Sequence, residues 1–336
     1  MANTDPDLGL LWSAFTGYQQ TAALKTAIEL NVFGQIAGGA TTIDGLAARC
    51  QTAPRGMRAL LNFLVMGGFL IREGEGYGLS PTAEAFLVPG TMGYIGGAAT
   101  FIGSPMIVDS FTHLTDAVRR GGTAVPDDGT LAPDHPVWVD FARAMSGIAG
   151  MTAVLMTNLL DMERVPVRTV LDIAAGHGMF GITLARMNPD VQVTGLDWRN
   201  VLAVAEQHAR EAGVADRYHV IAGSVFEVPF GEGYDLVLLP NILHHFDPPG
   251  CEHILAKARA ALAPHGRVVI VELVPDDDRR GPADAVRFAL VMLTTTPAGD
   301  AYTFAEYRDM LRQVGFGPAT LHELVPTPAR VIIAPK

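Results

Sequence analysis

Short apolar segments alternate with helical segments over residues 167–273, and this alternation constrains the fold more than any other feature of the chain. Runs of Val, Ile and Leu at strand length are typical of strands buried on both faces of a parallel sheet. The pattern therefore predicts a doubly wound α/β domain, whose ligand binds beyond the carboxyl ends of the strands. The predicted strands are "RTVLDIAA", "VQVTGLD", "YHVIAGS", "YDLVLLPN" and "GRVVIVEL", and the predicted helices span 178–187, 199–212 and 249–263.

The last segment of the chain, "ATLHELVPTPARVIIAPK", has a different pattern. It predicts two strands joined by a tight Pro-containing turn, and hence an antiparallel hairpin at the edge of the sheet. The expected class is thus α/β, with a mostly parallel sheet that ends in an antiparallel hairpin.

The first part of the chain predicts a separate helical domain. Apolar residues at helical spacing indicate helices over about 8–36, 42–50 and 54–66, the last with Thr52 as its N-cap and Pro54 in its first turn. The following "GFLIREGEGYGLSP" predicts a β-hairpin, which completes a winged-helix module. We expect a domain over residues 1–105, connecting helices over 106–165, and the α/β domain over 166–336. The connecting part contains a Pro/Gly/Asp-rich loop at 119–136 and helices from about 137 to 163.

Composition and charge exclude several classes of protein. The formal net charge of -11 disfavours nucleic acid and anionic membranes as partners, because both are bound through Lys and Arg. With only Cys50 and Cys251, neither a disulfide framework nor a four-cysteine zinc site is expected. The start of the chain has no basic segment followed by an apolar run, and stretches such as "LLNFLVMGGFLI" are too short to span a bilayer. We expect a cytoplasmic protein.

The loop after the first predicted strand, "LDIAAGHGMFG", contains Gly176, Gly178 and Gly181 in the spacing G-x-G-x-x-G. This pattern alone would fit a dinucleotide. However, Asp172 stands four residues before the first glycine, where a carboxylate faces a cationic ligand better than a pyrophosphate. Asp197 ends the second strand, the position of an acidic residue that accepts hydrogen bonds from ribose. Together with the closing hairpin, these residues favour S-adenosylmethionine (SAM), whose amino-acid tail and sugar the glycines let approach the backbone.

At these residues the chain resembles the SAM-dependent O-methyltransferases of the caffeic-acid and acetylserotonin type. The resemblance covers nearly the whole chain, through "VLDIAAGHG", "GLDWRNV", "AGSVFEVP", "NILHHFD", "GRVVIVELVP" and "TTTPAGDAYTFAEYRDMLRQVGF". It implies a homodimer formed through the N-terminal domain, and the apolar N-terminal helices agree with such an interface. The family has glycines where this chain has Ala174 and Ala175, and an aspartate where it has Ser224. The cofactor-binding residues implied by position are Asp172, Gly176, Gly178, Asp197, Trp198, Ser224, Val225 and Asn241.

The resemblance also implies the catalytic residues. A family histidine at the position of His244 removes the proton of the acceptor hydroxyl, and a carboxylate at the position of Glu272 orients it. Histidine suits this role because its pKa of about 6.5 leaves it neutral at working pH. A second family glutamate falls on Ala301. Either the adjacent Asp300 replaces it with a shift of one residue, or a single carboxylate supports the base.

Several nearby histidines need other interpretations. His244, His245, Asp247, Cys251 and His253 are close in sequence, but they lack the helical H-x-x-x-H spacing of a zinc site, so no metal is expected. His245 is expected to be a packed or surface residue. His177 is expected to lie near the cofactor tail without acting as an acid or base.

The acceptor site is only outlined by the sequence. Phe141 and Met145 are four residues apart and so share one helical face. The family resemblance implies that this pair packs against the acceptor ring and that Met292 and Thr296 also line the pocket; without it, a Phe/Met stripe would indicate core packing. An apolar pocket with few polar groups suits a small aromatic or polyketide-like metabolite.

Other functions remain open at this stage. A carbon or nitrogen acceptor in the same pocket would give a C- or N-methyltransferase, and the same scaffold serves other SAM-dependent reactions. A winged helix is also used by DNA-binding regulators, although residues 41–80 are nearly neutral. A nicotinamide-dependent dehydrogenase would share the glycine loop.

Overall fold

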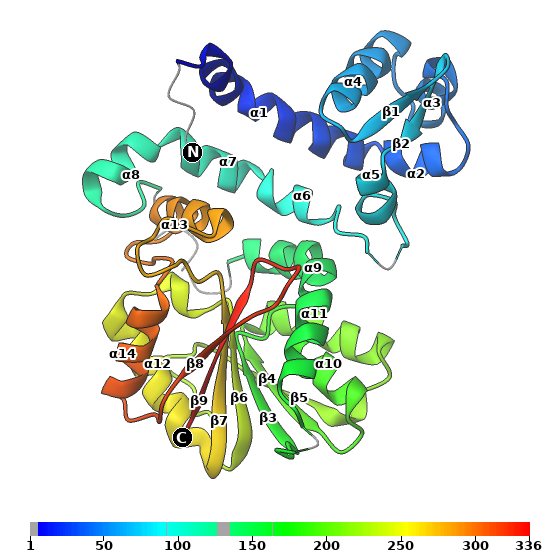
Figure 1. Cartoon of the computed structure of the whole chain (residues 1–336). Helices are drawn as coiled ribbons and strands as arrows, with labels where there is room; N and C mark the ends of the chain where they lie inside the picture. Colours follow the sequence, from blue (N-terminus) through cyan, green and yellow to red (C-terminus); the bar gives the residue numbers. More distant parts are fainter. Residues whose placement is uncertain (1–5, 92, 126–134, 163) are drawn as a thin grey trace. The chain divides into compact units, whose positions relative to one another are not determined.

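The computed structural model describes residues 6–91, 93–125, 135–162 and 164–336. The chain divides into two compact units, Met1–Pro105 and Met106–Lys336. The helices of the 106–165 region therefore belong to the same compact unit as the sheet. Figure 1 shows both units.

The N-terminal unit consists of helices and one antiparallel hairpin (Figure 1). The helix expected over 8–36 is interrupted, because Asn31 has a left-handed backbone (φ 55°) that ends one helix and begins the next. The N-cap of the 54–66 helix is Ala53 rather than Thr52, since Pro54 occupies the first helical position. The elements are α1 Leu8–Glu29, α2 Val32–Ala37, α3 Ile43–Arg49, α4 Pro54–Met66, β1 Leu70–Glu73, β2 Gly76–Leu79, α5 Pro81–Phe86 and α6 Ala98–Ile102.

The C-terminal unit is built on a seven-stranded sheet with the order β5-β4-β3-β6-β7-β9-β8 (Figure 1). Strands β3 to β7 are parallel to one another, whereas β9 is antiparallel to both β7 and β8. The α/β class and the closing hairpin are thus confirmed. The strands are β3 Thr169–Ile173, β4 Gln192–Asp197, β5 Tyr218–Ala222, β6 Tyr234–Pro240, β7 Leu262–Glu272, β8 Thr320–Glu323 and β9 Arg330–Pro335.

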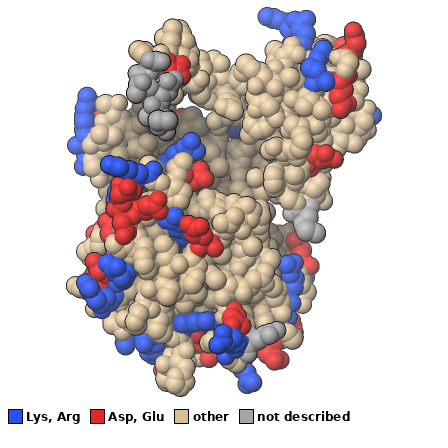
Figure 2. Space-filling view, in the orientation of Figure 1, with Lys and Arg blue, Asp and Glu red and all other residues tan. Residues whose placement is uncertain are grey.

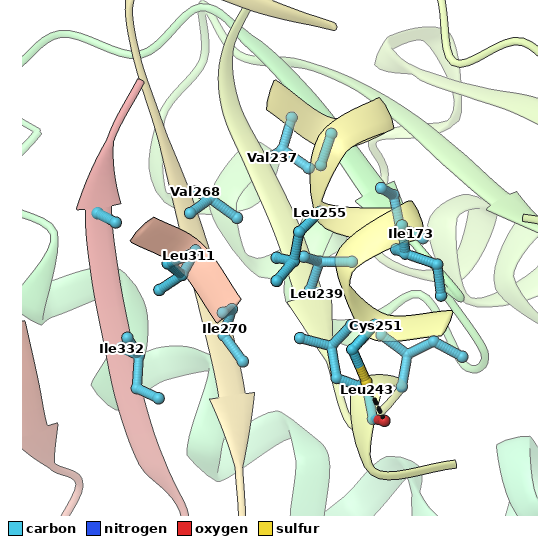
Figure 3. Close-up of a cluster of buried hydrophobic side chains, with 14 of the residues drawn as sticks. Ile173, Val237, Leu239, Leu243, Cys251, Leu255, Val268, Ile270, Leu311 and Ile332 are labelled. Atoms are coloured by element: carbon cyan, nitrogen blue, oxygen red, sulfur yellow. Dashed lines mark hydrogen bonds between the residues drawn. The ribbon is translucent and has the colours of Figure 1, made fainter. Parts of the chain in front are cut away.

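Helices cover both faces of this sheet, because alternate residues of each buried strand point to opposite sides. On one face, Val237 and Leu239 of β6 pack with residues of α12 and α14 (Figure 3). On the other face, Leu236 and Leu238 pack with residues of α9 and α10. The helices and short 3-10 turns are α7 Pro105–Thr112, α8 Leu114–Arg120, α9 Val137–Leu159, α10 Met179–Met187, α11 Arg199–Glu211, η2 Ala215–Arg217, η3 Leu243–His245, α12 Pro248–Ala261, α13 Ala283–Thr295 and α14 Phe304–Gln313.

Among the described residues, α9 alone is long and apolar enough to cross a membrane. The sequence-based expectation that every apolar stretch is too short did not consider this helix. Its buried residues include Ala149, Ala153 and Met156, which belong to the core formed with α10 and the sheet. This packing is typical of a core helix in an α/β domain.

Charged side chains of both signs are interspersed on the surface of the C-terminal unit that faces the viewer in Figure 2. Several lie in pairs, such as Arg279 with Asp300 and Glu306, and Arg330 with Asp276. A surface of this kind differs from the broad basic face that a nucleic acid requires.

A substitution at Gly181 tests how closely α10 packs against the sheet. A Cβ at this position would lie 2.6 Å from Cγ1 of Val193 and 3.0 Å from Oδ2 of Asp172. We expect Gly181→Ala to lower the free energy of unfolding by about 1–3 kcal/mol, because both neighbours are buried and must move. Gly150→Ala in α9 is the matched control, since its Cβ would meet only the flexible end of Met179, at 3.4 Å. Chemical denaturation measures both, and equal stability of the two variants would contradict this packing.

Candidate active site

A cavity of about 290 Å³ lies in the C-terminal unit at the carboxyl ends of β3, β4 and β6. Its lining combines aromatic rings with acidic and small polar groups, and among the described lining residues there is no lysine or arginine. The lining residues are Trp138, Phe141, Ala174, Ala175, Gly176, His177, Phe180, Asp197, Trp198, Val201, Gly223, Ser224, Val225, Phe226, Glu227, Pro240, Asn241, Ile242, His245 and Phe246.

Asp197, the last residue of β4, presents its carboxyl group to this cavity. Oδ2 accepts a hydrogen bond from the backbone N–H of Gly176 at 2.8 Å, and Oδ1 accepts one from Trp198 N–H at 2.7 Å. Burial raises the pKa of Asp197 to about 6, against the lowering effect of these two bonds. Gly176 takes a left-handed conformation (φ 57°) that brings its N–H to the carboxylate. The glycine loop is therefore tied to an acidic side chain.

A second loop on the cavity wall is held by a lysine that the sequence analysis did not identify. Lys257 of α12 donates hydrogen bonds to the carbonyl oxygens of Val225 and Val228, at 2.5 and 3.0 Å. Its ammonium group also lies 4.4 Å from the centre of the Phe230 ring. Ser224 and Val225 line the cavity as predicted. Only the tertiary structure reveals this role, because Lys257 is 32 residues away from the loop.

Two of the predicted cofactor residues lie behind the cavity lining. Asp172 is fully buried and accepts a hydrogen bond from Gly181 N–H at 3.1 Å, on the face of the sheet covered by α10. Burial raises its pKa to about 8, so it is mostly neutral at pH 7 and does not present a charge to a cation. Gly178 is the N-cap of α10, with φ 74°, and its missing Cβ leaves room for Ala205 and Tyr218. Both residues position the loop rather than line the cavity.

The sheet brings the predicted catalytic pair, His244 and Glu272, together. Glu272 ends β7 and His244 lies in η3, just after β6, so the neighbouring strands place them side by side. Oε2 of Glu272 is 2.5 Å from Nδ1 of His244, and Oε1 accepts a hydrogen bond from Leu243 N–H at 3.0 Å. Both side chains are buried. The carboxylate thus fixes the orientation of the imidazole.

His245, expected to be a packed or surface residue, is buried beside His244 and lines the cavity. Its Nε2 is 3.1 Å from Nε2 of His244, and it is a lining residue, whereas His244 is not. The ring of Trp138 meets His245 edge to face, with 5.0 Å between ring centres. Nδ1 of His245 is buried and has no hydrogen-bond partner among the described residues.

The η3 turn that carries both histidines is held from below. The thiol of Cys251 donates a hydrogen bond to the Leu243 carbonyl at 3.0 Å (Figure 3), and the hydroxyl of Tyr302 donates one to the Phe246 carbonyl at 2.6 Å. Burial raises the pKa of the Cys251 thiol, which keeps it a neutral donor. Cys251 was considered as a metal ligand from the sequence, but here it supports the turn. Among the described residues, no group of three or more His, Cys, Asp or Glu side chains is arranged to bind a metal.

Of the four predicted acceptor residues, only Phe141 lines this cavity. Its ring stacks on His177 at a centre distance of 6.3 Å. Met145 is partly buried elsewhere on α9, and Met292 is buried at the end of α13. Thr296 accepts a hydrogen bond from Gly299 N–H at 2.9 Å. Thr296 therefore holds the Gly299 loop, which passes close to the carbonyl of His244.

Asp300, the candidate for the second carboxylate, forms an ion pair. Asp300 lies 3.3 Å from the guanidinium of Arg279, which also binds Glu306. Ala301 is buried and contributes no polar side chain. Glu272 is therefore the carboxylate that contacts His244 within the described part of the chain.

Comparison with known proteins identifies the family. The O-methyltransferase domain family matches residues 111–317, and the O-methyltransferase dimerisation domain matches residues 12–89. The chain belongs to the O-methyltransferase family.

Two curated relatives cover almost the whole chain. The 3-hydroxy-5-methyl-1-naphthoate 3-O-methyltransferase of Streptomyces sahachiroi is 32% identical over 91% of this chain and 88% of its own length. The tetracenomycin polyketide synthesis 8-O-methyl transferase of Streptomyces glaucescens is 30% identical, over 92% and 91% of the two chains.

Solved structures agree with this assignment. A provisionally assigned O-methyltransferase of Nostoc punctiforme PCC 73102 is 48% identical and has a TM-score of 0.94, with coverage of 99% of this chain and 100% of that one. Human N-acetylserotonin methyltransferase, solved in complex with SAM, is 23% identical and shares the fold, with a TM-score of 0.85 and 99% coverage of both chains.

Proposed function

We propose that this O-methyltransferase transfers the methyl group of SAM to a hydroxyl group on a small aromatic or polyketide-like molecule. The observation that supports this proposal most directly is made at the carboxyl ends of the strands. There the acidic cavity around Asp197 adjoins the buried His244–Glu272 pair. One part of this rim suits a cationic donor, and the other suits a proton acceptor.

The cavity fits SAM in the chemistry of its side chains. In this proposal Asp197 accepts hydrogen bonds from the ribose, and Trp198, Phe226 and Ser224, which line the cavity, contact the adenine. Asp197 and Glu227 favour a ligand with a positive charge, and the described lining offers no cation that would repel it. When bound, SAM supplies an electrophilic methyl group on a positively charged sulfur.

The same features disfavour a nicotinamide dinucleotide. A pyrophosphate needs free backbone N–H groups or cations at the glycine loop. Here the N–H of Gly176 already donates to a carboxylate, which would repel a phosphate. The glycine loop therefore binds the carboxylate of Asp197 through the N–H of Gly176, instead of an anionic ligand.

In this proposal, His244 is the base that accepts the proton of the acceptor hydroxyl. A phenol has a pKa of about 10, so complete prior transfer of its proton to a neutral imidazole would cost roughly 5 kcal/mol. Glu272 keeps the ring oriented for this step, because its carboxylate oxygen is 2.5 Å from Nδ1. The proton therefore leaves as the methyl group arrives, and not before.

The acceptor class rests on the lining of the cavity and on the relatives. Trp138 and Phe141 form an edge-to-face pair, with 5.8 Å between ring centres, at the side of the cavity near His245. Aromatic walls with few polar groups suit a flat ring system. The two Streptomyces relatives act on a hydroxynaphthoate and in tetracenomycin polyketide synthesis, according to their names.

We also propose that the protein is a homodimer through its N-terminal unit. Helix α1 lies within the matched dimerisation domain from residue 12 onward, yet its large apolar side chains are exposed. Such a surface is rarely left in water on a soluble monomer. Because the matched family is a dimerisation domain, the proposed partner of α1 is the same helix of a second copy of the chain. The exposed side chains are Leu8, Leu10, Leu11, Trp12, Phe15 and Tyr18.

Cofactor binding should depend on the charge of Asp197. Because the pKa of Asp197 is about 6 and the ionised form binds the ribose, we expect the affinity for SAM to be constant above pH 7. It should fall as the pH drops below 6, by at most tenfold per pH unit, until it reaches the affinity of the neutral side chain. Asp197→Asn should weaken binding by about 2 kcal/mol, or roughly 30-fold, and remove most of this pH dependence. Calorimetry measures both, and a pH dependence unchanged in the variant would contradict the assignment.

Methyl transfer should depend on His244. With 3-hydroxy-5-methyl-1-naphthoate as the acceptor probe and methyl-labelled SAM, we expect His244→Ala to lower kcat by roughly 10²–10⁴-fold. Its affinity for SAM should be nearly unchanged, because His244 does not line the cavity. His265→Asn, an exposed histidine, is the control. Full activity of His244→Ala, or a product methylated on carbon in place of oxygen, would refute this function.

The dimer should depend on the apolar side chains of α1. Trp12 and Phe15 are 60% and 67% exposed, so their replacement by aspartate leaves the fold of the unit intact while placing charge in the interface. We expect the double variant to elute with the 35.7 kDa mass of one chain and the unaltered protein with twice that mass. Val118→Asp in α8, an equally exposed apolar residue, should remain dimeric. Light scattering after size-exclusion chromatography measures the mass of each variant. A double variant that stays dimeric would exclude α1 from the interface.

A further inference from the structure

His177 stands between two glycines of the loop after β3, and its side chain is part of the cavity wall. The ring stacks on Phe141, with 6.3 Å between ring centres, and lies 6.0 Å from the ring of Phe180. Both phenylalanines also line the cavity, and His177 is only 4% exposed. The imidazole is therefore held in place, and each of its two nitrogens has defined surroundings.

The surroundings of the ring determine which nitrogen of His177 carries a proton. Nδ1 accepts a hydrogen bond from the backbone N–H of Met179 at 3.1 Å. Burial, together with the neighbouring His208, lowers the pKa of His177 to about 3, so the ring is neutral at working pH. A neutral imidazole carries one proton, and this proton must be on Nε2 because Nδ1 is an acceptor. Nε2–H is therefore a hydrogen-bond donor.

This donor has no acceptor within the described part of the chain, where the bond at Nδ1 is the only hydrogen bond of the ring. Nε2 is also not among the buried polar atoms that are enclosed without a partner. Because the ring lines the cavity, its Nε2–H opens into that space. A ligand that displaces water from the cavity must offer an acceptor to this donor, since an unpaired buried donor costs binding free energy.

SAM has one anionic group, the carboxylate of its amino-acid tail, and the described cavity lining offers this group no lysine or arginine. The places proposed for the ribose at Asp197 and for the adenine at Ser224 leave the tail to the rest of the lining, which includes His177. The loop of His177 leads into α10, whose first turn carries a partial positive charge. A carboxylate is therefore favoured on this side of the cavity.

We propose that Nε2–H of His177 donates a hydrogen bond to the carboxylate of the SAM tail, and that His177 thereby selects for ligands that carry this group. The inference rests on the proposed function and deepens it, because it names a specificity-determining atom of the cofactor site. A hydrogen bond to an anion is stronger than one between neutral groups. A neutral donor also has an advantage over a lysine, because it does not repel the sulfonium and the ammonium group of the same ligand.

Two ligands that differ in one group isolate the carboxylate. S-adenosylhomocysteine has it, and the decarboxylated form of this compound has the same adenosine, sulfur and ammonium group without it. By calorimetry, we expect the unaltered protein to bind S-adenosylhomocysteine at least roughly tenfold more tightly. Equal affinity for the two ligands would overturn the proposal.

Two variants of His177 separate the donor from the shape of the loop. Asparagine keeps an oxygen near the position of Nδ1, for the N–H of Met179, but has no atom at the position of Nε2; glutamine reaches that position with an amide N–H. We expect His177→Asn to weaken binding of S-adenosylhomocysteine roughly tenfold and to change the affinity for the decarboxylated form by less than about twofold. His177→Gln should recover most of this loss. Equal weakening of both ligands by His177→Asn would show that the histidine only shapes the loop, which overturns the proposal.

The results also separate this inference from the proposed function. Unchanged affinity for S-adenosylhomocysteine in His177→Asn would overturn the role of His177 and leave the proposed cofactor intact. If neither ligand binds to the unaltered protein, the proposed cofactor fails and the inference fails with it. Thermal unfolding of the unliganded variants checks that each is folded, with His265→Asn, at an exposed position, as the control for histidine replacement. Should His177→Asn not fold, the comparison of the two ligands on the unaltered protein still decides.

Discussion

The buried carboxylate of Glu272 is the constraint on which the site depends. The Glu272 side chain is 1% exposed, and removing a carboxylate from water costs several kcal/mol. Nearby hydrogen-bond donors must therefore compensate for the lost water. Both donors come from one short segment, the N–H of Leu243 and the ring of His244, so the turn after β6 has to lie against the end of β7. The thiol of Cys251 and the hydroxyl of Tyr302 hold the same turn through its carbonyl oxygens. The geometry of the His244–Glu272 pair and local stability therefore rest on the same hydrogen bonds.

A comparable arrangement organises the cofactor side of the rim. Asp197 is bound by the N–H groups of Gly176 and Trp198, which hold the glycine loop and the start of α11 around one carboxylate. Lys257 holds the opposite loop through two carbonyl oxygens. Each loop is thus positioned by a polar side chain from a neighbouring strand or helix, and the cavity between them needs few residues of its own to be rigid.

Much of this protein was predictable from local patterns. The buried strands from "RTVLDIAA" to "GRVVIVEL", the terminal hairpin and the helical N-terminal domain are confirmed, since hydrophobic period and turn residues are local properties. The pairing of His244 with Glu272 was implied by the resemblance to the family, and the structure places the two side chains in contact. Their catalytic roles stay predictions. The interruption at Asn31 and the N-cap at Ala53 were not predicted, because single backbone angles depend on neighbours that a periodic pattern does not specify.

The sequence by itself determined which chemical groups arrive at the carboxyl rim of the sheet, because strand order in the chain and the parallel arrangement place those ends together. Only the tertiary structure decided which way each side chain faces. Asp172 lies on the face covered by α10 and is removed from the cavity, Asp300 is taken by Arg279, and Met145, Met292 and Thr296 lie outside the cavity lining. His245, expected to be a packed or surface residue, is buried against His244 and lines the cavity. The reason is physical: orientation at the rim is set by contacts with Gly181, Arg279, Trp138 and other residues far away in sequence, and a local pattern carries no information about them.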